Sequence, residues 1–202
     1  MSIRQSIHRV RARFGARLES SGRERGAALV EFALILPILV LLTFGIVEFS
    51  SAYHDSSQTA DAARAGGRVG SAQATSTGYA TSVVNAVNAA LSTMPKDAPK
   101  ELWIYKANSK GYPGTGTDFS TCGSNCIKYT WNPSARAFNA ANPQGGGWPA
   151  SSHQVCHEPF DEIGVYVKVD HRFVTKMFGA GITLTDHSVF RFEPVPTSVC
   201  AG

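Results

Sequence analysis

The segment from Ala27 to Val47 is the strongest constraint on how this chain can fold, because only Glu31 among its twenty-one residues is charged. With its flanks, from Gly26 to Ser50, it reads GAALVEFALILPILVLLTFGIVEFS. About 20 apolar residues in a helix cross the hydrocarbon of a bilayer. We therefore predict a single transmembrane helix over residues 27–49. A carboxylate in such a segment is unfavourable unless a partner neutralises it, so Glu31 is a candidate functional residue.

The distribution of charge along the chain indicates its orientation. A formal charge of +4 would favour nucleic-acid binding if it were spread evenly. Residues 1–26, however, hold seven arginines and two glutamates, a net +5, and the remainder is −1. Basic residues beside a membrane segment mark the cytoplasmic side. We expect a basic cytoplasmic leader over residues 1–26, a single-pass protein of the cell membrane, and no nucleic-acid partner.

A secretory signal peptide is the alternative interpretation, since it too joins a basic region to an apolar one. The apolar segment is longer than the core of a signal peptide, and no small-x-small cleavage sequence follows it in a clean position; Ser51 and Ala52 fit only loosely. With a cytoplasmic N-terminus, residues 50–202 form an extracytoplasmic domain.

The pattern of residues 50–202 predicts an α+β fold. The membrane helix should continue to about Arg64, because the segment after Ser50 is rich in Ala and lacks Pro, and Gly66-Gly67 offers a C-terminal stop. A second helix is expected over residues 78–94, where apolar residues recur at helical spacing. Apolar and polar residues then alternate with a period of two, which predicts about four strands. These are residues 102–105, 127–131, 163–173 and 182–193. They should form a small antiparallel sheet covered on one face by the two helices.

All four cysteines follow the membrane segment, in what we predict to be an oxidising compartment. They are Cys122, Cys126, Cys156 and Cys200. An even number in such a compartment indicates two disulfides. Of the three possible connectivities we prefer Cys122 with Cys126, closing a tight loop, and Cys156 with Cys200, tying a long loop to the tail. A zinc site made with His153 and His157 is the alternative, but the spacing of the cysteines only allows such a site and is not diagnostic of it. We expect no metal and no cofactor.

The sequence contains no pattern typical of an active site. A nucleophile elbow, a zinc-protease motif and a phosphate-binding loop are all missing from it. Asp170 and His171 are consecutive in a predicted strand, so they should face opposite sides of the sheet. We therefore do not expect an enzyme. The aromatic residues of the strands should pack the sheet, while Trp148 and Tyr112, in glycine-rich loops, are candidates for a surface contact.

Two stretches resemble the TadE-like family of pilin-related proteins, which is associated with the tight-adherence (Flp-type) pilus of bacteria and archaea. They are RERGAALVEFALILPILVLLTFGIVEF and the small-residue segment TADAARAGGRVG. The C-terminal pair GVYVKVDHRF and GITLTDHSVFRFEP resembles the family more weakly. The loops and the cysteines are not part of the resemblance.

The resemblance implies that a prepilin-type peptidase cuts after Gly26. Ala27 would then be the new N-terminus, Glu31 the fifth residue and Phe32 the sixth, where the major Flp pilins usually have Tyr; the difference favours a minor pilin-like protein. The α-amino group of Ala27 would be a cation that pairs with Glu31 of a neighbouring subunit in low dielectric. Alternatively, Glu31 lies in the first turn of an uncut helix and reaches cytoplasmic water.

Two functions follow from these predictions. The first is a membrane-anchored, pilin-like minor component (a minor pseudopilin) of a tight-adherence pilus or a related secretion apparatus, acting in assembly, adhesion or tethering. Its partners would be the lipid bilayer, other pilin-like subunits and pilus assembly proteins. The alternative is an uncleaved, single-pass extracellular binding module or adhesin, whose loops 108–126 and 132–160 contact a partner. The N-terminus of the mature chain distinguishes them.

Overall fold

A computed structural model describes the backbone of residues 3–200 and the side chains of residues 25–196, 198 and 200. The side chains of the predicted basic leader, up to Glu24, therefore lie outside the described residues. The chain divides into two compact units, Met1–Phe49 and Ser50–Gly202. We call the second unit the head.

The first helix, α1 (Ile3–Ser71), is longer than the sequence suggested. It passes through Pro37, and the predicted end near Arg64 is wrong, because the helix continues through Gly66 and Gly67 to Ser71. A Cβ at Gly66 would lie 2.8 Å from a methyl carbon of Val87. These glycines let the helix approach its neighbours closely rather than end it.

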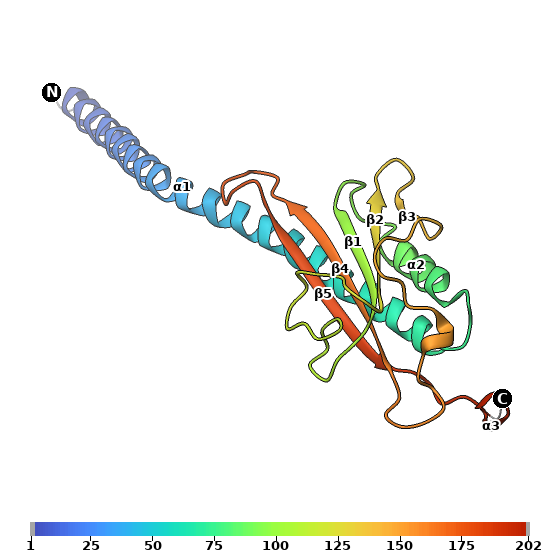
Figure 1. The fold of residues 1–202 in the computed structure, drawn as a ribbon. Coiled ribbons are helices and arrows are strands. Elements are labelled where there is room, and N and C mark those ends of the chain that lie inside the picture. Colours follow the sequence, from blue (N-terminus) through green and yellow to red (C-terminus); the bar gives the residue numbers. More distant parts are fainter. Residues whose placement is uncertain (1–2, 201–202) are drawn as a thin grey trace. The chain divides into compact units, whose positions relative to one another are not determined.

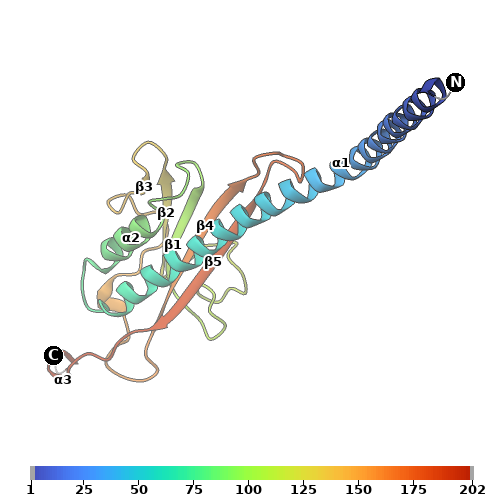
Figure 2. The same cartoon turned by 180° about the vertical axis from the view of Figure 1, so that it is seen from behind.

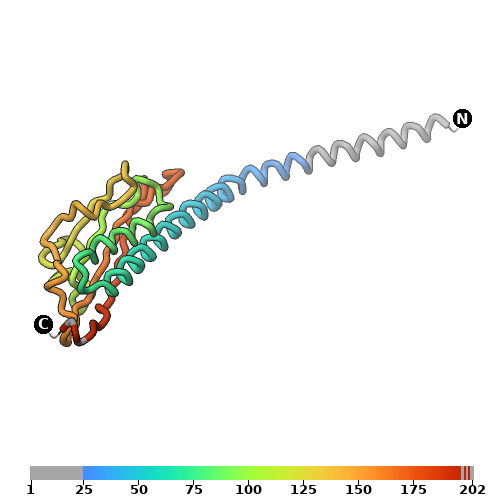
Figure 3. The backbone as a smooth tube through the Cα atoms, turned by 90° about the vertical axis from the view of Figure 1, so that its right-hand side faces the viewer, coloured from blue at the N-terminus to red at the C-terminus, as the bar shows by residue number. Residues whose placement is uncertain are grey.

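The second helix, α2 (Tyr79–Ala90), packs beside the last turns of α1 (Figure 3). It buries Tyr79 and three valines, which follow helical spacing. It ends four residues before the predicted Met94. Residues just before Pro95 are disfavoured in helical conformation by the proline ring, so the chain continues in turns.

The head contains a five-stranded sheet in the order β3-β2-β1-β4-β5, in which every neighbouring pair is antiparallel (Figure 1). The strands are β1 (Pro99–Lys106), β2 (Cys126–Asn132), β3 (Ala137–Phe138), β4 (Glu162–Arg172) and β5 (Gly181–Arg191). Two short helices, η1 (Ala150–Ser152) and α3 (Thr197–Cys200), lie in the C-terminal part of the chain. The α+β class is confirmed. The fifth strand, β3, was missed because two residues are too few to show alternation.

The two faces of the sheet are covered differently. On β1, Leu102 and Ile104 belong to the main core, with the valines of α2 and the inward residues of β4. The intervening Trp103 and Tyr105 belong to a second cluster on the opposite face. Figure 2 shows α1 crossing the first face, as expected, and Figure 1 shows the β1–β2 loop lying over the other.

Candidate functional site

The apolar part of α1 is the first component of the candidate site. Among the described residues, one helix, Arg25–Ser71, is long and apolar enough to cross a membrane, judged by length and composition. Large apolar side chains before Ser50 are exposed, for example Leu29 at 69% and Ile46 at 70%. Apolar surface of this extent is typical of a segment that contacts lipid or other proteins.

The predicted processing and assembly residues lie on this exposed part of α1. Gly26, Ala27, Glu31 and Phe32 are all exposed, and a Cβ added at Gly26 would meet no atom within 4 Å. Ala27 and Glu31 are four residues apart on a helix, so they lie one turn apart on the same face. Cleavage after Gly26 and pairing of Glu31 between subunits stay predictions.

The part of α1 within the head carries small residues on its buried face. Ala60, Ala62 and Ala63 are buried. Further along, a Cβ at Gly70 would lie 2.9 Å from a methyl carbon of Val83 and would also meet Ile163. The small residues of the segment TADAARAGGRVG therefore bring the helix axis close to α2 and β4.

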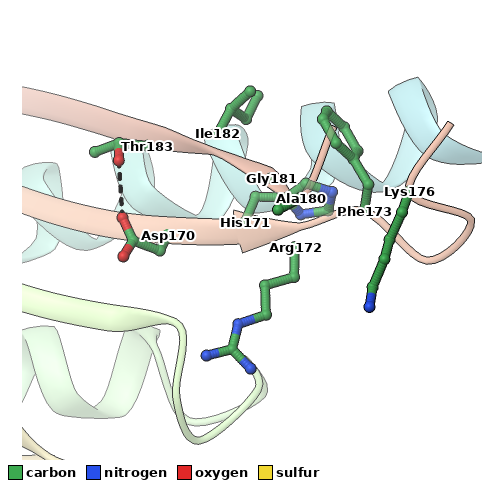
Figure 4. Close-up of a pocket in the computed structure, with 9 residues that line it drawn as sticks. All are labelled: Asp170, His171, Arg172, Phe173, Lys176, Ala180, Gly181, Ile182 and Thr183. Carbon is green, nitrogen blue, oxygen red and sulfur yellow. Dashed lines mark hydrogen bonds between the residues drawn. The ribbon is translucent and has the colours of Figure 1, made fainter. Parts of the chain in front are cut away.

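A hydrogen bond links the first turns of α1 within the head to the sheet. Nδ1 of His171, on β4, donates to Oδ2 of Asp55, on α1, at 2.7 Å, and both side chains are largely buried. The neighbouring Asp170 points to the opposite face, as the strand period predicts. There it accepts a hydrogen bond of 2.9 Å from Oγ1 of Thr183 (Figure 4) and lies 3.8 Å from Nζ of Lys100. Asp170 and His171 thus serve two different contacts.

The model of the TadE-like protein family matches residues 26–68 of this chain. This segment is TadE-like. The match confirms the resemblance, and it spans both the exposed apolar part of α1 and the small-residue part that packs in the head. No curated protein and no solved structure matches the chain.

The part of the head beyond the TadE-like segment contains both disulfides. Cys122 is bonded to Cys126, with Cα atoms 5.4 Å apart, and Cys156 to Cys200, with Cα atoms 5.5 Å apart. This is the connectivity that we preferred from the sequence. The first bond closes the turn that enters β2, and the second ties the loop before β4 to α3.

Trp148, expected at the surface, is instead buried, and only 1% of it is exposed. Its loop folds back into the main core, where the ring lies 4.3 Å from that of His153 and 5.5 Å from that of Phe192, measured between centroids. Nδ1 of His153 donates to the carbonyl oxygen of Ala74, just after α1. Burial lowers the pKa of His153. The glycines of NPQGGGWP indicated a loop correctly but not its return to the core.

Tyr112, the other predicted contact, is partly buried in an aromatic layer under the β1–β2 loop. Its ring lies 5.2 Å from Phe119, which stacks on Tyr166 of β4 at 4.3 Å with an interplanar angle of 14°. The hydroxyl of Tyr105 donates to the carbonyl oxygen of Gly111 at 2.8 Å, and burial raises the pKa of Tyr105 above its usual range. The loop therefore covers a sheet face.

A surface cavity of about 480 Å³ lies between the start of α2, β2 and the loop around residues 140–151. Its lining includes Thr81, Tyr129, Gln144 and Ser151. The mixture of aromatic, amide and hydroxyl groups is the kind of lining that binds small polar ligands. Part of its wall comes from loop 132–160, one of the two loops that the alternative function assigns to a partner contact.

Proposed function

We propose that this chain is a membrane-anchored, pilin-like minor component of a tight-adherence pilus or a related secretion apparatus. The single observation that carries the proposal is the TadE-like match over residues 26–68. Support comes from the exposed apolar helix within that match, which fits a membrane anchor by length and composition. The basic leader favours a cytoplasmic N-terminus, and the two disulfides are typical of a head in an oxidising compartment.

Processing would occur between Gly26 and Ala27, through a prepilin-type peptidase. Both residues lie in α1, so the helix must unwind locally before a peptidase can hold the chain in extended form. Glycine is among the least favourable residues within a helix, by about 1 kcal/mol relative to alanine. Gly26 therefore lowers the free energy needed to open the helix at the position where the bond is cut.

Glu31 would act in assembly. In the bilayer its carboxylate is unfavourable without a cation, and the α-amino group of a cleaved Ala27 supplies one. Subunits that pack helix against helix can place the amino group of one chain beside the Glu31 of the next. The exposed position of Glu31 on α1 leaves it accessible to a neighbouring subunit.

The first test is the mature N-terminus of the membrane-extracted protein, by intact mass and N-terminal peptide. We expect a chain that begins at Ala27. A chain that still begins at Met1 would contradict processing. It would favour the alternative, an uncleaved binding module whose loops 108–126 and 132–160 contact a partner.

The second test separates assembly from processing. Glu31→Gln should leave cleavage intact but reduce incorporation into the pilus assembly, because it removes the charge and keeps the shape of the side chain. Glu24→Gln is the matched control, since it changes an acid in the leader that cleavage removes. Equal incorporation of the Glu31→Gln chain and the wild-type chain would contradict the role of Glu31.

A further inference from the structure

The hairpin that joins β4 to β5 carries most of the exposed large apolar side chains of the head. Among the described residues after Ser50, these side chains are Tyr53, Val174, Met177, Phe178 and Ile182. Val174 is 79% exposed and Met177 is 50% exposed. Tyr53 is on α1, three residues after Ser50. Val174, Met177 and Phe178 are in the turn of the hairpin, and Ile182 is the second residue of β5. Isolated exposed apolar residues are common, but a group confined to one turn indicates a contact surface.

This hairpin lies beside the first turn of α1 within the head. A cavity of about 300 Å³ is lined by Ser51 and Asp55 from α1 together with His171 and Val174 from the hairpin end of β4. Figures 1 and 2 both show the end of the β4–β5 hairpin beside the part of α1 that belongs to the head. Ser51 follows the predicted membrane segment by two residues. If α1 crosses a bilayer as proposed, the short chain connection keeps Ser51, and with it the hairpin residues that share its cavity, near the lipid headgroups.

Two cations accompany the apolar tip. Arg172 and Lys176 line a cavity of about 510 Å³ at the end of the hairpin, with Phe173 and Ile182 also in its wall. Figure 4 shows the guanidinium and the ammonium directed to the same side of the hairpin. Both side chains are exposed, and none of the ion pairs among the described residues includes either one. Asp170, which lines the same cavity, accepts a hydrogen bond from Thr183.

We infer that the β4–β5 hairpin is a second membrane contact, in which Val174, Met177 and Phe178 enter the headgroup region of an anionic bilayer and Arg172 and Lys176 bind lipid phosphates. The inference rests on the proposed function, since it needs α1 to cross the same bilayer. Apolar side chains that enter the interface beside basic ones that bind phosphates are how peripheral segments bind anionic membranes. The hairpin would hold the head against the membrane surface.

The test measures the depth of the hairpin in the full chain. The chain is reconstituted into phosphatidylcholine vesicles with and without phosphatidylglycerol, and an environment-sensitive dye is attached to Met177→Cys. Shielding of the dye from aqueous iodide, and its quenching by lipid-attached groups, report insertion of the tip. Thr115→Cys, exposed in the loop that leaves the opposite end of β1, is the matched control site.

We expect the dye at position 177 to be shielded in phosphatidylglycerol vesicles and the dye at position 115 to stay accessible. A basic residue near an anionic surface contributes about 1 kcal/mol, so Arg172→Gln and Lys176→Gln should each lower the equilibrium constant for docking about fivefold. Added salt should lower it too, because the charges are exposed. Unchanged tryptophan fluorescence of the head would show that the variants are folded.

Three results would overturn the inference. In the first, the dye at position 177 is as accessible to iodide as the dye at position 115 although α1 is inserted. Insertion of α1 is reported separately by a dye at Leu39→Cys, which lipid-attached groups quench when the helix crosses the bilayer. Shielding at 177 could be independent of phosphatidylglycerol but dependent on protein concentration, in which case the hairpin contacts a second copy. Finally, an accessible dye at position 39 would show that α1 does not cross the bilayer, and the proposed anchoring would fail with the inference.

Discussion

Leu, Ile, Val and Phe side chains cover α1 before Ser50 and are exposed, whereas Ala and Gly line its buried face between Ala52 and Gly70. The same helix thus uses two kinds of surface. A helix with large apolar residues on all sides is typical of a segment surrounded by lipid or by other helices. Small residues on one face suit a partner that is already fixed, here the sheet and α2. The size of the side chains therefore indicates which partner each part of α1 has.

The largest expected effect concerns the disulfides, which lie only in the head. The entropy of loop closure predicts that replacing Cys156 and Cys200 by Ser, across a separation of 44 residues, lowers the free energy of unfolding of the head by about 4 kcal/mol. Replacing Cys122 and Cys126, across a separation of 4 residues, should lower it by about 2 kcal/mol. Denaturant unfolding of the full chain in detergent measures both.

Tryptophan fluorescence reports the head alone in that experiment, because all three tryptophans follow residue 102. Helicity of the apolar part should not change in either cysteine variant. Equal losses for the two pairs would contradict the dependence on loop length. A simultaneous loss of the detergent-bound helix would contradict the separation of α1 into two independent surfaces.

The next prediction places a charge on the exposed apolar part. Leu39→Arg should weaken membrane insertion by about 3 kcal/mol, because a guanidinium is unfavourable at the centre of a bilayer. Extraction of membranes with alkaline carbonate would measure the released fraction, while the unfolding midpoint of the head should stay the same. Ser57→Arg, at an exposed position of α1 in the head, is the control and should remain in the membrane. Retention of Leu39→Arg at the wild-type level would argue against a transmembrane role.

The reciprocal change enlarges a residue on the packed part. Gly66→Leu should lower the free energy of unfolding of the head by about 2 kcal/mol, since overpacking of a filled core is unfavourable by this order. Val83, Val87 and Val165 surround the position of the added Cβ. Ala28→Leu, on the exposed part, should leave the head unchanged. Equal midpoints for the two variants in denaturant would show that the packed part tolerates large residues as the exposed part does.

The smallest effect concerns pH. Burial lowers the pKa of His153 below its ordinary value of 6.5, so the unfolded chain takes up a proton first as the pH falls. The contribution of neutral His153 is complete above pH 6.5 and is lost as the pH falls below it toward the folded pKa. Wild type should therefore lose more stability on acidification than His153→Gln, which cannot titrate. Parallel pH profiles would contradict this account.

Much of the fold followed from period and composition. The four strands of ordinary length alternate strongly enough to be recognised, and the two helices follow helical spacing. The end of α1 could not be predicted from Gly66 and Gly67, because a glycine that ends a helix and a glycine that admits a neighbouring side chain look the same in one sequence. Only the tertiary neighbours, Val87 and Phe190, distinguish the two uses.

The candidate site was partly predictable. Glu31 stands out in sequence because a carboxylate in an apolar segment is unusual. The burial of Trp148 was not predictable, since glycines and prolines mark a loop without saying where it returns. The pairing of Asp55 with His171 joins residues 116 positions apart, and no local pattern connects them. The apolar tip of the β4–β5 hairpin carried a signal that was overlooked: Val174, Met177 and Phe178 lie in a turn, where polar residues are usual.

The close packing of α1 on the sheet also has a mechanical consequence. Valine side chains surround Gly66, the ring of Phe190 lies against Gly67, and Ile163 lies against Gly70. A pull along the axis of the helix would have to move all of these side chains past the helix at once. Contacts loaded in shear resist together, whereas contacts that peel apart yield one after another. Tension on α1 would therefore be carried into the sheet with the head still folded.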